Sequence, residues 1–395
     1  MLYHLSQYLS ETTDIPGLGL MGYLSFRAML AGIISLLISL FAGKSIIAAL
    51  QRAQIGETIR DLGLEGQLQK KGTPTMGGII IILAVLSSSL LVCDLTNIYT
   101  ILLFITTLWC GAIGFADDYI KVFKHNKEGL SEKAKLALQF FLGLTIAVII
   151  CASPDIHTEK LVTTIPFVKA HEFDYSWLSP FKGQLGVYCT WGIYMILIIF
   201  IMLACSNGTN LTDGMDGLAA GTTAIVGTVI GIMAWLGSSA VQAGYLNIMH
   251  LPGSGEVAIF MAAFVGALLG FLWYNSYPAQ VFMGDTGSLT IGGIVGVSAI
   301  LIRKELLLPV LCGIFLMESL SVLIQRGYFK YTKKKYGAGR RVWKMTPLHH
   351  HYQKEGIESL ITKPEHALPE AKIVSRFWLV GILLAIVTLA MMKIR

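Results

Sequence analysis

The chain has 395 residues, of which 54% are hydrophobic and only 14% are charged. Soluble domains carry about 25% charged residues, so this composition excludes a soluble multidomain protein. Uncharged apolar runs recur along most of the length. Such runs are typical of helices that cross a membrane, because each helix satisfies its own backbone hydrogen bonds there. We therefore predict an all-α, polytopic integral membrane protein.

Ten apolar windows of roughly 20 residues predict membrane-spanning helices. They cover residues 26–50, 76–94, 97–117, 134–153, 186–206, 217–236, 256–276, 286–303, 305–327 and 375–393. We expect these ten helices to form a single transmembrane domain, residues 1–395.

Lysine and arginine are concentrated in the connections after the first, third and ninth windows. Because positively charged loops stay on the cytoplasmic side of a membrane, ten alternating helices place both termini on the periplasmic side. The loop at 154–185 is then periplasmic, and its Val-Thr-Thr-Ile-Pro and Glu-Phe-Asp-Tyr pieces predict a short hairpin. The segment 328–374 becomes a long, basic cytoplasmic loop.

The stretch 207–219, Asn-Gly-Thr-Asn-Leu-Thr-Asp-Gly-Met-Asp-Gly-Leu-Ala, separates the fifth window from the sixth. Asp213 and Asp216 are the only carboxylates between residues 183 and 255. Carboxylates beside lipid are costly unless they have cationic partners or a function, so we predict a site for a phosphate-bearing substrate here. Asp216 is alternatively the N-cap of the following helix, and free amides at that helix end would also attract phosphate.

Other polar motifs fall at the cytoplasmic ends of other windows. The segment 70–78, Lys-Lys-Gly-Thr-Pro-Thr-Met-Gly-Gly, offers lysines, hydroxyls and glycines to a phosphate, although taken alone it fits a basic turn at the membrane surface better. Asp117 and Asp118 end the third window, where they oppose the helix macrodipole. Adjacent residues point about 100° apart on a helix, so the two carboxylates need not share one role. Asp285 opens the eighth window, as a cap or as a metal ligand.

The consecutive histidines 349–351 do not match the spacing of a zinc site. They could hydrogen-bond a phosphate or belong to a solvated loop near anionic lipid. Glu318 lies inside the ninth window, where a carboxylate is a candidate for function, although the sequence shows no partner for it.

Carboxylates, lysines, amides and histidines from at least four connections thus converge on one membrane face. This inventory predicts phosphoryl chemistry assisted by Mg²⁺ or Mn²⁺, with the active site in a cytoplasmic-face cleft. A transporter for an anion or a metal is the alternative. Transport carboxylates, however, usually lie near the middle of the membrane rather than at one edge.

The motifs at 72–78, 115–121, 207–219, 284–288 and 347–352 together resemble the polyprenyl-phosphate N-acetylhexosamine-1-phosphate transferases. The Thr-Pro-Thr-Met-Gly-Gly and triple-histidine segments look specifically like the branch that handles phospho-N-acetylmuramoyl-pentapeptide. The resemblance implies transfer of phospho-MurNAc-pentapeptide from UDP-MurNAc-pentapeptide to undecaprenyl phosphate, giving lipid I and UMP. It further implies Mg²⁺, the bacterial inner membrane, the first membrane step of peptidoglycan synthesis, a homodimer and no nucleic-acid partner.

The resemblance also implies roles for individual residues. Asp285 looks like the principal Mg²⁺ ligand, with Asp117 as a second ligand or a base and Asp118 beside it. Other functional polar positions are matched by Lys70, Asn210, Asp213 and His349. The uridine pocket, in which Phe282 stacks on the base, is matched by Gly214, Met215, Asp216 and Phe282. Further substrate contacts are expected at Thr75, Lys121, Lys135, Asn207, Asn275, His350 and His351. Lys133 is close enough in the sequence to be the basic contact in place of Lys135.

The role of Asp117 and the identity of the donor sugar stay open. A base at Asp117 adds little, because a phosphate monoester with a pKa near 6 is already mostly dianionic at pH 7. Asp117 could instead orient a lysine or the metal, or attack as a nucleophile in a two-step route. A related transferase that uses UDP-GlcNAc fits the same motifs.

The resemblance also implies the shape of the ninth helix. In this family that helix breaks and extends into the bilayer beside a lipid groove, and Ser319 to Tyr331 would be that piece.

Overall fold

The computed structural model describes residues 1–13, 17–53, 72–124, 126, 128–153, 161–168 and 172–393. Within these residues the secondary structure is helical apart from one antiparallel hairpin, β1 (Val162–Thr164) and β2 (Glu172–Asp174). The all-α prediction is therefore confirmed in its main part. The hairpin lies where the sequence predicted it, with Thr163 opposite Phe173.

Within the described part of the chain, eight helices are long and apolar enough to cross a membrane. They are α2 (Leu24–Ala53), α4 (Ile98–Phe123), α5 (Glu132–Ala152), α6 (Gly183–Thr212), α7 (Leu218–Ser238), α9 (Gly255–Asn275), α10 (Gly284–Leu301) and α14 (Glu370–Met391). The shorter helical elements are α1 (Leu2–Thr12), η1 (Leu18–Gly22), α3 (Gly78–Val92), η3 (Tyr175–Leu178), α8 (Ala240–Leu246), η4 (Glu305–Leu307), α11 (Leu308–Leu311), α12 (Gly313–Tyr336) and α13 (Leu348–Gln353).

Every predicted window overlaps a helix, but the number of crossings stays a prediction. The second window corresponds to α3, which has only 15 residues and is therefore short for a span of roughly 20 residues. The ninth window corresponds to a bent pair, in which the segment η4–α11 meets α12 at 75°. The structure thus supports a polytopic membrane protein without fixing the count at ten.

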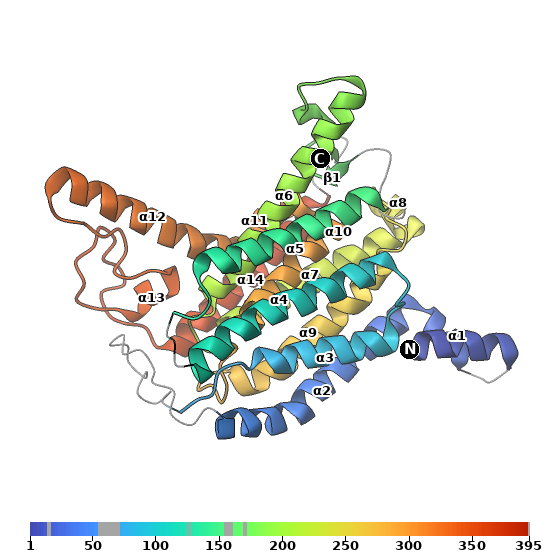
Figure 1. Ribbon diagram of the computed structural model, residues 1–395, viewed down its shortest axis with the longest axis horizontal. Helices are drawn as coiled ribbons and strands as arrows, with labels where there is room; N and C mark the ends of the chain where they lie inside the picture. The colour runs from blue at the N-terminus through green and yellow to red at the C-terminus, as the bar shows by residue number, and fades with distance from the viewer. Residues whose placement is uncertain are drawn as a thin grey trace.

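The position of the bend corrects one expectation. The prediction that a separate piece starts at Ser319 is wrong, because α12 is continuous from Gly313 and the break falls at Cys312. Pro309 in the first turn of α11 and a glycine at the start of α12 are residues that accommodate helix interruptions. Beyond the bend, α12 projects away from the other helices (Figure 1). Its first half exposes the apolar side chains Leu316, Met317, Leu320, Leu323 and Ile324.

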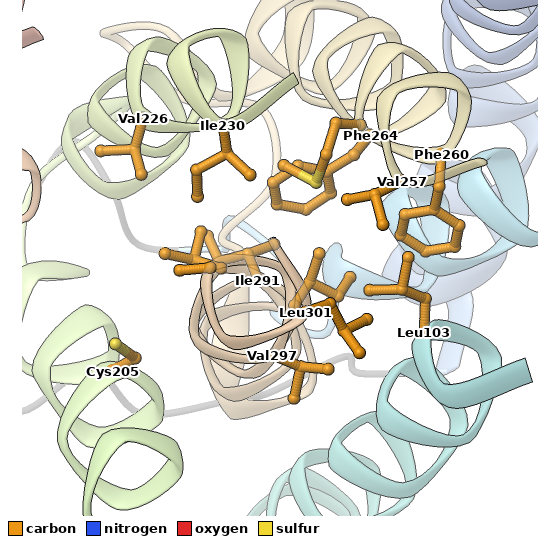
Figure 2. Close-up of a cluster of buried hydrophobic side chains, with 14 of the residues drawn as sticks. Leu103, Cys205, Val226, Ile230, Val257, Phe260, Phe264, Ile291, Val297 and Leu301 are labelled. Carbon is orange, nitrogen blue, oxygen red and sulfur yellow. The ribbon is translucent and has the colours of Figure 1, made fainter. Parts of the chain in front are cut away.

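Helix α10 is the centre of the bundle. Of its apolar window 89% is buried, and it packs against α3, α4, α6 and α7. Figure 2 shows Ile291, Val297 and Leu301 of α10 in the buried apolar cluster, with Ile230 of α7 and Phe264 of α9 on neighbouring helices. The start of α10 is thereby fixed from several sides, and that start carries the candidate site.

Contacts at the helix ends show that both ends of the described chain lie at one end of the bundle. The Met1 amine donates to the Leu90 carbonyl oxygen, near the end of α3, at 2.5 Å. The Lys393 ammonium lies 5.5 Å from the centre of the Tyr245 ring on α8. The hairpin is at the same end (Figure 1), whereas α13 lies at the opposite end. This arrangement agrees with an even number of crossings, while the side of the membrane stays a prediction.

A single methyl group tests the packing of α3 against α10. A Cβ atom on Gly78 would lie 2.1 Å from the Gly287 backbone nitrogen, a contact that neither backbone can relieve by a rotamer change. We expect Gly78→Ala to destabilise the protein by about 1–3 kcal/mol or more, measured as a lower melting temperature in detergent. Gly192→Ala on α6, where nothing lies within 4 Å of the added Cβ, is the control and should be neutral or slightly stabilising. Equal melting temperatures for both variants would contradict this packing.

Candidate active site

Asp118 caps the start of α10 from another helix. Its Oδ2 accepts hydrogen bonds from the Thr286 backbone amide at 2.8 Å and from the Thr286 hydroxyl at 2.6 Å. Its Oδ1 accepts from the Asp285 amide at 3.1 Å. The first amides of a helix have no partner within the helix, and an aspartate is a favoured acceptor for them. Asp285 therefore lies in the first turn of α10 without capping it.

Asp117 points to different partners. It is fully buried, and its two oxygens lie 2.5 Å from the Lys121 ammonium and 2.8 Å from the Lys135 ammonium. The same two ammonium groups lie 3.1 Å and 2.7 Å from Asp285 Oδ2. Buried charges are costly unless paired, and this four-charge cluster pairs each carboxylate with both lysines. Asp117 and Asp118 thus have different partners, and their roles stay predictions.

The carboxylates fit a hard divalent cation. One oxygen each from Asp117, Asp118 and Asp285 lies within 4.8 Å of the others, and oxygen ligands of this kind suit Mg²⁺ or Mn²⁺. The oxygens of Asp118 already accept three hydrogen bonds from the start of α10. Asp117 and Asp285 are instead held mainly by ammonium groups, which a metal cation can replace. The residues present therefore fit a divalent cation.

The end of α6 contributes an amide to this centre. The Asn210 side chain donates to Asp285 Oδ1 at 2.9 Å and to the Ser288 hydroxyl at 2.8 Å. The Asn207 side chain, one turn earlier, donates instead to Gln139 Oε1 on α5 at 2.8 Å. Asn210 thus belongs to the charged centre, while Asn207 joins two helices behind it.

Residues 213–217 form the connection between α6 and α7. Asp213 and Asp216 therefore do not share a helix face, and Asp216 is not the side-chain cap of α7, whose N-cap is Gly217 at φ 78°. The Asp216 carboxylate accepts from the Ala279 amide at 3.0 Å, and its own amide donates to Glu370 Oε1 at 2.7 Å. These bonds attach the connection to the 276–283 loop and to the start of α14.

Asn275 attaches the same two segments from the other side. Its side chain accepts from the Gly217 amide at 3.0 Å and donates to the Val281 carbonyl oxygen at 2.9 Å. Phe282, half-buried, follows in that loop, and its amide donates to the Pro74 carbonyl oxygen at 2.8 Å.

The loop before α3 also reaches the centre. A Cβ on Gly284 would lie 2.9 Å from the Thr75 hydroxyl and 2.6 Å from Asp118 Oδ2, so Thr75 is beside the start of α10. Lys70, the remaining candidate in this loop, lies outside the described residues.

Asp213 carries an unusual proton affinity. Burial, followed by the negative charges of Asp285, Asp118 and Asp216, raises the pKa of the Asp213 carboxyl to about 8. In the metal-free protein this carboxyl is therefore mostly neutral at pH 7. A bound cation or a change of pH would alter its charge.

His349 is held by Glu318, the carboxylate for which the sequence showed no partner. Both His349 and Glu318 are fully buried, and His349 Nδ1 lies 3.2 Å from Glu318 Oε2. The His349 amide also donates to Glu318 Oε1 at 3.2 Å. On its other side, His349 Nε2 would be 2.2 Å from a Cβ on Gly214. Glu318 thus fixes the ring that supports the 213–217 connection.

The other two histidines and Met215 have mainly internal contacts. His351 is buried, accepts from the Lys344 amide at Nδ1 (3.1 Å), and its Nε2 lies 2.8 Å from the Lys363 carbonyl oxygen. His350 Nδ1 lies 2.9 Å from Gln353 Oε1. Met215 is in a buried apolar cluster with Leu218, Ile373 and Val374. Their roles in binding substrate stay predictions.

Four hydrogen-bond partners of the candidate residues were not predicted from the sequence. Thr286 and Ser288 lie next to Asp285, and their hydroxyls in Gly-Asp-Thr-Gly-Ser were an available signal. Gln139 and Glu370 gave none, because the contacts that use them join segments far apart in the chain.

The Asp213 carboxyl gives a pH test in the metal-free protein. Its folded pKa, about 8, exceeds the usual unfolded value of about 3.9, so ionisation penalises the folded state increasingly as pH rises between these values and fully above pH 8. We expect Asp213→Asn to raise the melting temperature in EDTA more at pH 8 than at pH 5. An effect that is independent of pH would contradict the raised pKa.

Comparison with known proteins places these residues in a family. The family model "Glycosyl transferase family 4" matches residues 100–303, which include the Asp117–Asp285 cluster. A signature of phospho-N-acetylmuramoyl-pentapeptide-transferases matches residues 70–82. Proteins of that name from Parabacteroides distasonis, Flavobacterium psychrophilum and Bacteroides fragilis are 54%, 53% and 48% identical to this chain, each with 100% of both chains covered. The chain therefore belongs to glycosyl transferase family 4 and, within it, to the phospho-N-acetylmuramoyl-pentapeptide-transferases.

Proposed function

We propose that this chain transfers phospho-MurNAc-pentapeptide from UDP-MurNAc-pentapeptide to undecaprenyl phosphate, which yields lipid I and UMP. The observation that carries the proposal is the partly buried cluster of Asp117 and Asp285 with Lys121 and Lys135, in a chain with full-length relatives of that name. The eight apolar helices support a membrane enzyme. We place it in the bacterial inner membrane, as a homodimer, at the first membrane step of peptidoglycan synthesis.

The proposed reaction is one displacement at phosphorus. An oxygen of the lipid phosphate attacks the β-phosphorus, the bond from that phosphorus to the bridging oxygen breaks, and UMP leaves with that oxygen. Both substrates are anions, and Lys121 and Lys135 are the cations that hold them at the centre. Mg²⁺ or Mn²⁺, held by Asp117 and Asp285, would neutralise charge on the pyrophosphate when bound.

Asp117 orients cations in this proposal and does not act as a base. Its carboxylate contacts both lysines and also accepts from the Leu130 amide at 2.7 Å, so both of its oxygens already have partners within the protein. The lipid phosphate is mostly dianionic at pH 7 and needs no base. The same contacts hinder attack by Asp117 on phosphorus, so the two-step route is the weaker alternative.

Asp118 acts on Asp285 through the backbone. Because Asp118 binds the first amides of α10, it fixes the residue that we assign as the principal metal ligand. Asn210 fixes the other side of the same carboxylate. We therefore assign Asp118 and Asn210 as positioning residues.

The 213–217 connection is the proposed seat of the nucleotide. Gly214 is exposed, so its backbone is available to the uridine. The Asn275 side chain joins this connection to Val281, the residue before Phe282, and we assign Phe282 to stack on the base. Met215 and Asp216 are buried, and their contacts inside the protein set the shape of the connection. In this proposal the centre faces the cytoplasm and both termini are periplasmic.

UMP release by the purified protein tests the proposal. With UDP-MurNAc-pentapeptide and undecaprenyl phosphate we expect release that depends on Mg²⁺, and a loss of at least about a hundredfold in kcat for Asp285→Asn and Asp117→Asn. Asp94→Asn is the control, because Asp94 pairs with His4 at the other end of the bundle.

Three outcomes would contradict the proposal. Normal turnover by Asp285→Asn would remove the metal assignment. Preference for UDP-GlcNAc as donor would identify the related transferase. Nucleotide-sugar flux into proteoliposomes without UMP formation would identify a transporter.

A further inference from the structure

A cavity of about 430 Å³ lies outside the charged centre, between α12 and the segment that leads to α13. Its lining includes three cationic side chains, Arg326, Lys330 and Arg341, together with Phe329 and Thr346. Among the described residues that line it there is no carboxylate. Its chemistry therefore suits an anion attached to a larger organic group.

The wall opposite α12 is fixed by hydrogen bonds. Gln325 Oε1 accepts from the amides of Val342 at 2.9 Å and Trp343 at 3.1 Å, and its Nε2 donates to the Trp343 carbonyl oxygen at 3.0 Å. The Arg341 guanidinium donates to the Lys344 carbonyl oxygen at 3.1 Å. The cavity is thus bounded by two attached segments.

The two cations that α12 contributes to the cavity have no acidic partner among the described residues. Within the part of the chain that the structure describes, Arg326 and Lys330 have no carboxylate within 4.0 Å. Two uncompensated positive charges in a concave site attract an external anion.

The cavity is close to the proposed nucleotide seat along the chain. Thr346 lines the cavity, and His349, three residues later, supports Gly214. Three residues span at most roughly 10 Å. A substrate bound at the 213–217 connection could therefore extend past His349 into the cavity.

The substrate class in the relatives' name supplies such an anion. In a muramoyl-pentapeptide the amino end of the peptide is acylated, so the carboxyl end is free and ionised at pH 7. Five extended residues reach up to roughly 17 Å, which is enough to cross the distance above. We propose that this cavity binds the carboxylate end of the peptide stem, an inference that rests on the proposed transferase function.

A membrane phospholipid headgroup is the competing anion, because α12 exposes Leu323 and Ile324 just before Arg326. The fixed polar wall around Gln325 and the short path to His349 favour the substrate. If the cavity binds the peptide carboxylate, changes in its cations lower kcat/KM only with the donor that carries that carboxylate. If it binds a headgroup, they lower kcat/KM equally with both donors.

The experiment compares two donors, UDP-MurNAc-pentapeptide and the same compound with a C-terminal carboxamide. The wild type should have a kcat/KM about three- to tenfold higher for the acid, as expected for partly exposed charge pairs. The double variant Arg326→Gln/Arg341→Gln should lose this preference while it keeps the rate with the carboxamide. Lys333→Gln/Lys334→Gln, which removes two exposed charges of α12 that do not line the cavity, should keep the preference.

Other results would overturn the inference. The first is a wild type with the same kcat/KM for the acid and the carboxamide. The second is a cavity variant whose kcat/KM falls by the same factor with both donors. The third is a fall in kcat/KM that a higher fraction of phosphatidylglycerol restores for both donors. Melting temperatures in detergent show whether each variant is folded, and the single Lys330→Gln variant provides a second reading of the preference. A wild type that releases no UMP from either donor refutes the proposed function itself.

Discussion

The site depends on one joint, where the end of α4 meets the start of α10. Two adjacent aspartates of α4 reach in different directions, so that Asp118 binds the free amides of α10 while Asp117 meets Asp285 and the two lysines. Carboxylates in an apolar bundle are stable only with such partners. A close approach makes the joint possible, since a Cβ on Gly114 would lie 2.2 Å from the Asp285 carbonyl oxygen.

The joint also explains the division of labour among the polar residues. Groups that contact Asp285 directly, such as Asn210 and Lys135, form the charged centre. Asp216 and Asn275 bind backbone groups of two connections and hold the shape around that centre. A rigid polar frame of this kind keeps charged groups in place before substrate binds, which is the condition for electrostatic catalysis.

The sequence predicted a helical membrane protein and the hairpin, whereas the roles of Lys121, Lys135 and Asp285 in the site were implied by resemblance to a family. Apolar windows are a local signal, and each of them overlaps a helix in the fold. The pair of Glu318 with His349 could not be predicted, because the two residues belong to different helices, α12 and α13, and only the fold of the segment between them brings them together. The same holds for the capping of α10 by Asp118, since a cap from another helix leaves no pattern at the helix it caps.

The most direct test is the position of Mn²⁺ in crystals of the protein, located by its anomalous scattering. The account predicts one Mn²⁺ within roughly 2 Å of oxygens from Asp285 and Asp117, with the ammonium groups of Lys121 and Lys135 moved aside and Asp118 still bound to Thr286. Mn²⁺ bound by Asp118 with the Thr286 amide released, or no Mn²⁺ at this cluster at saturating concentration, would contradict it.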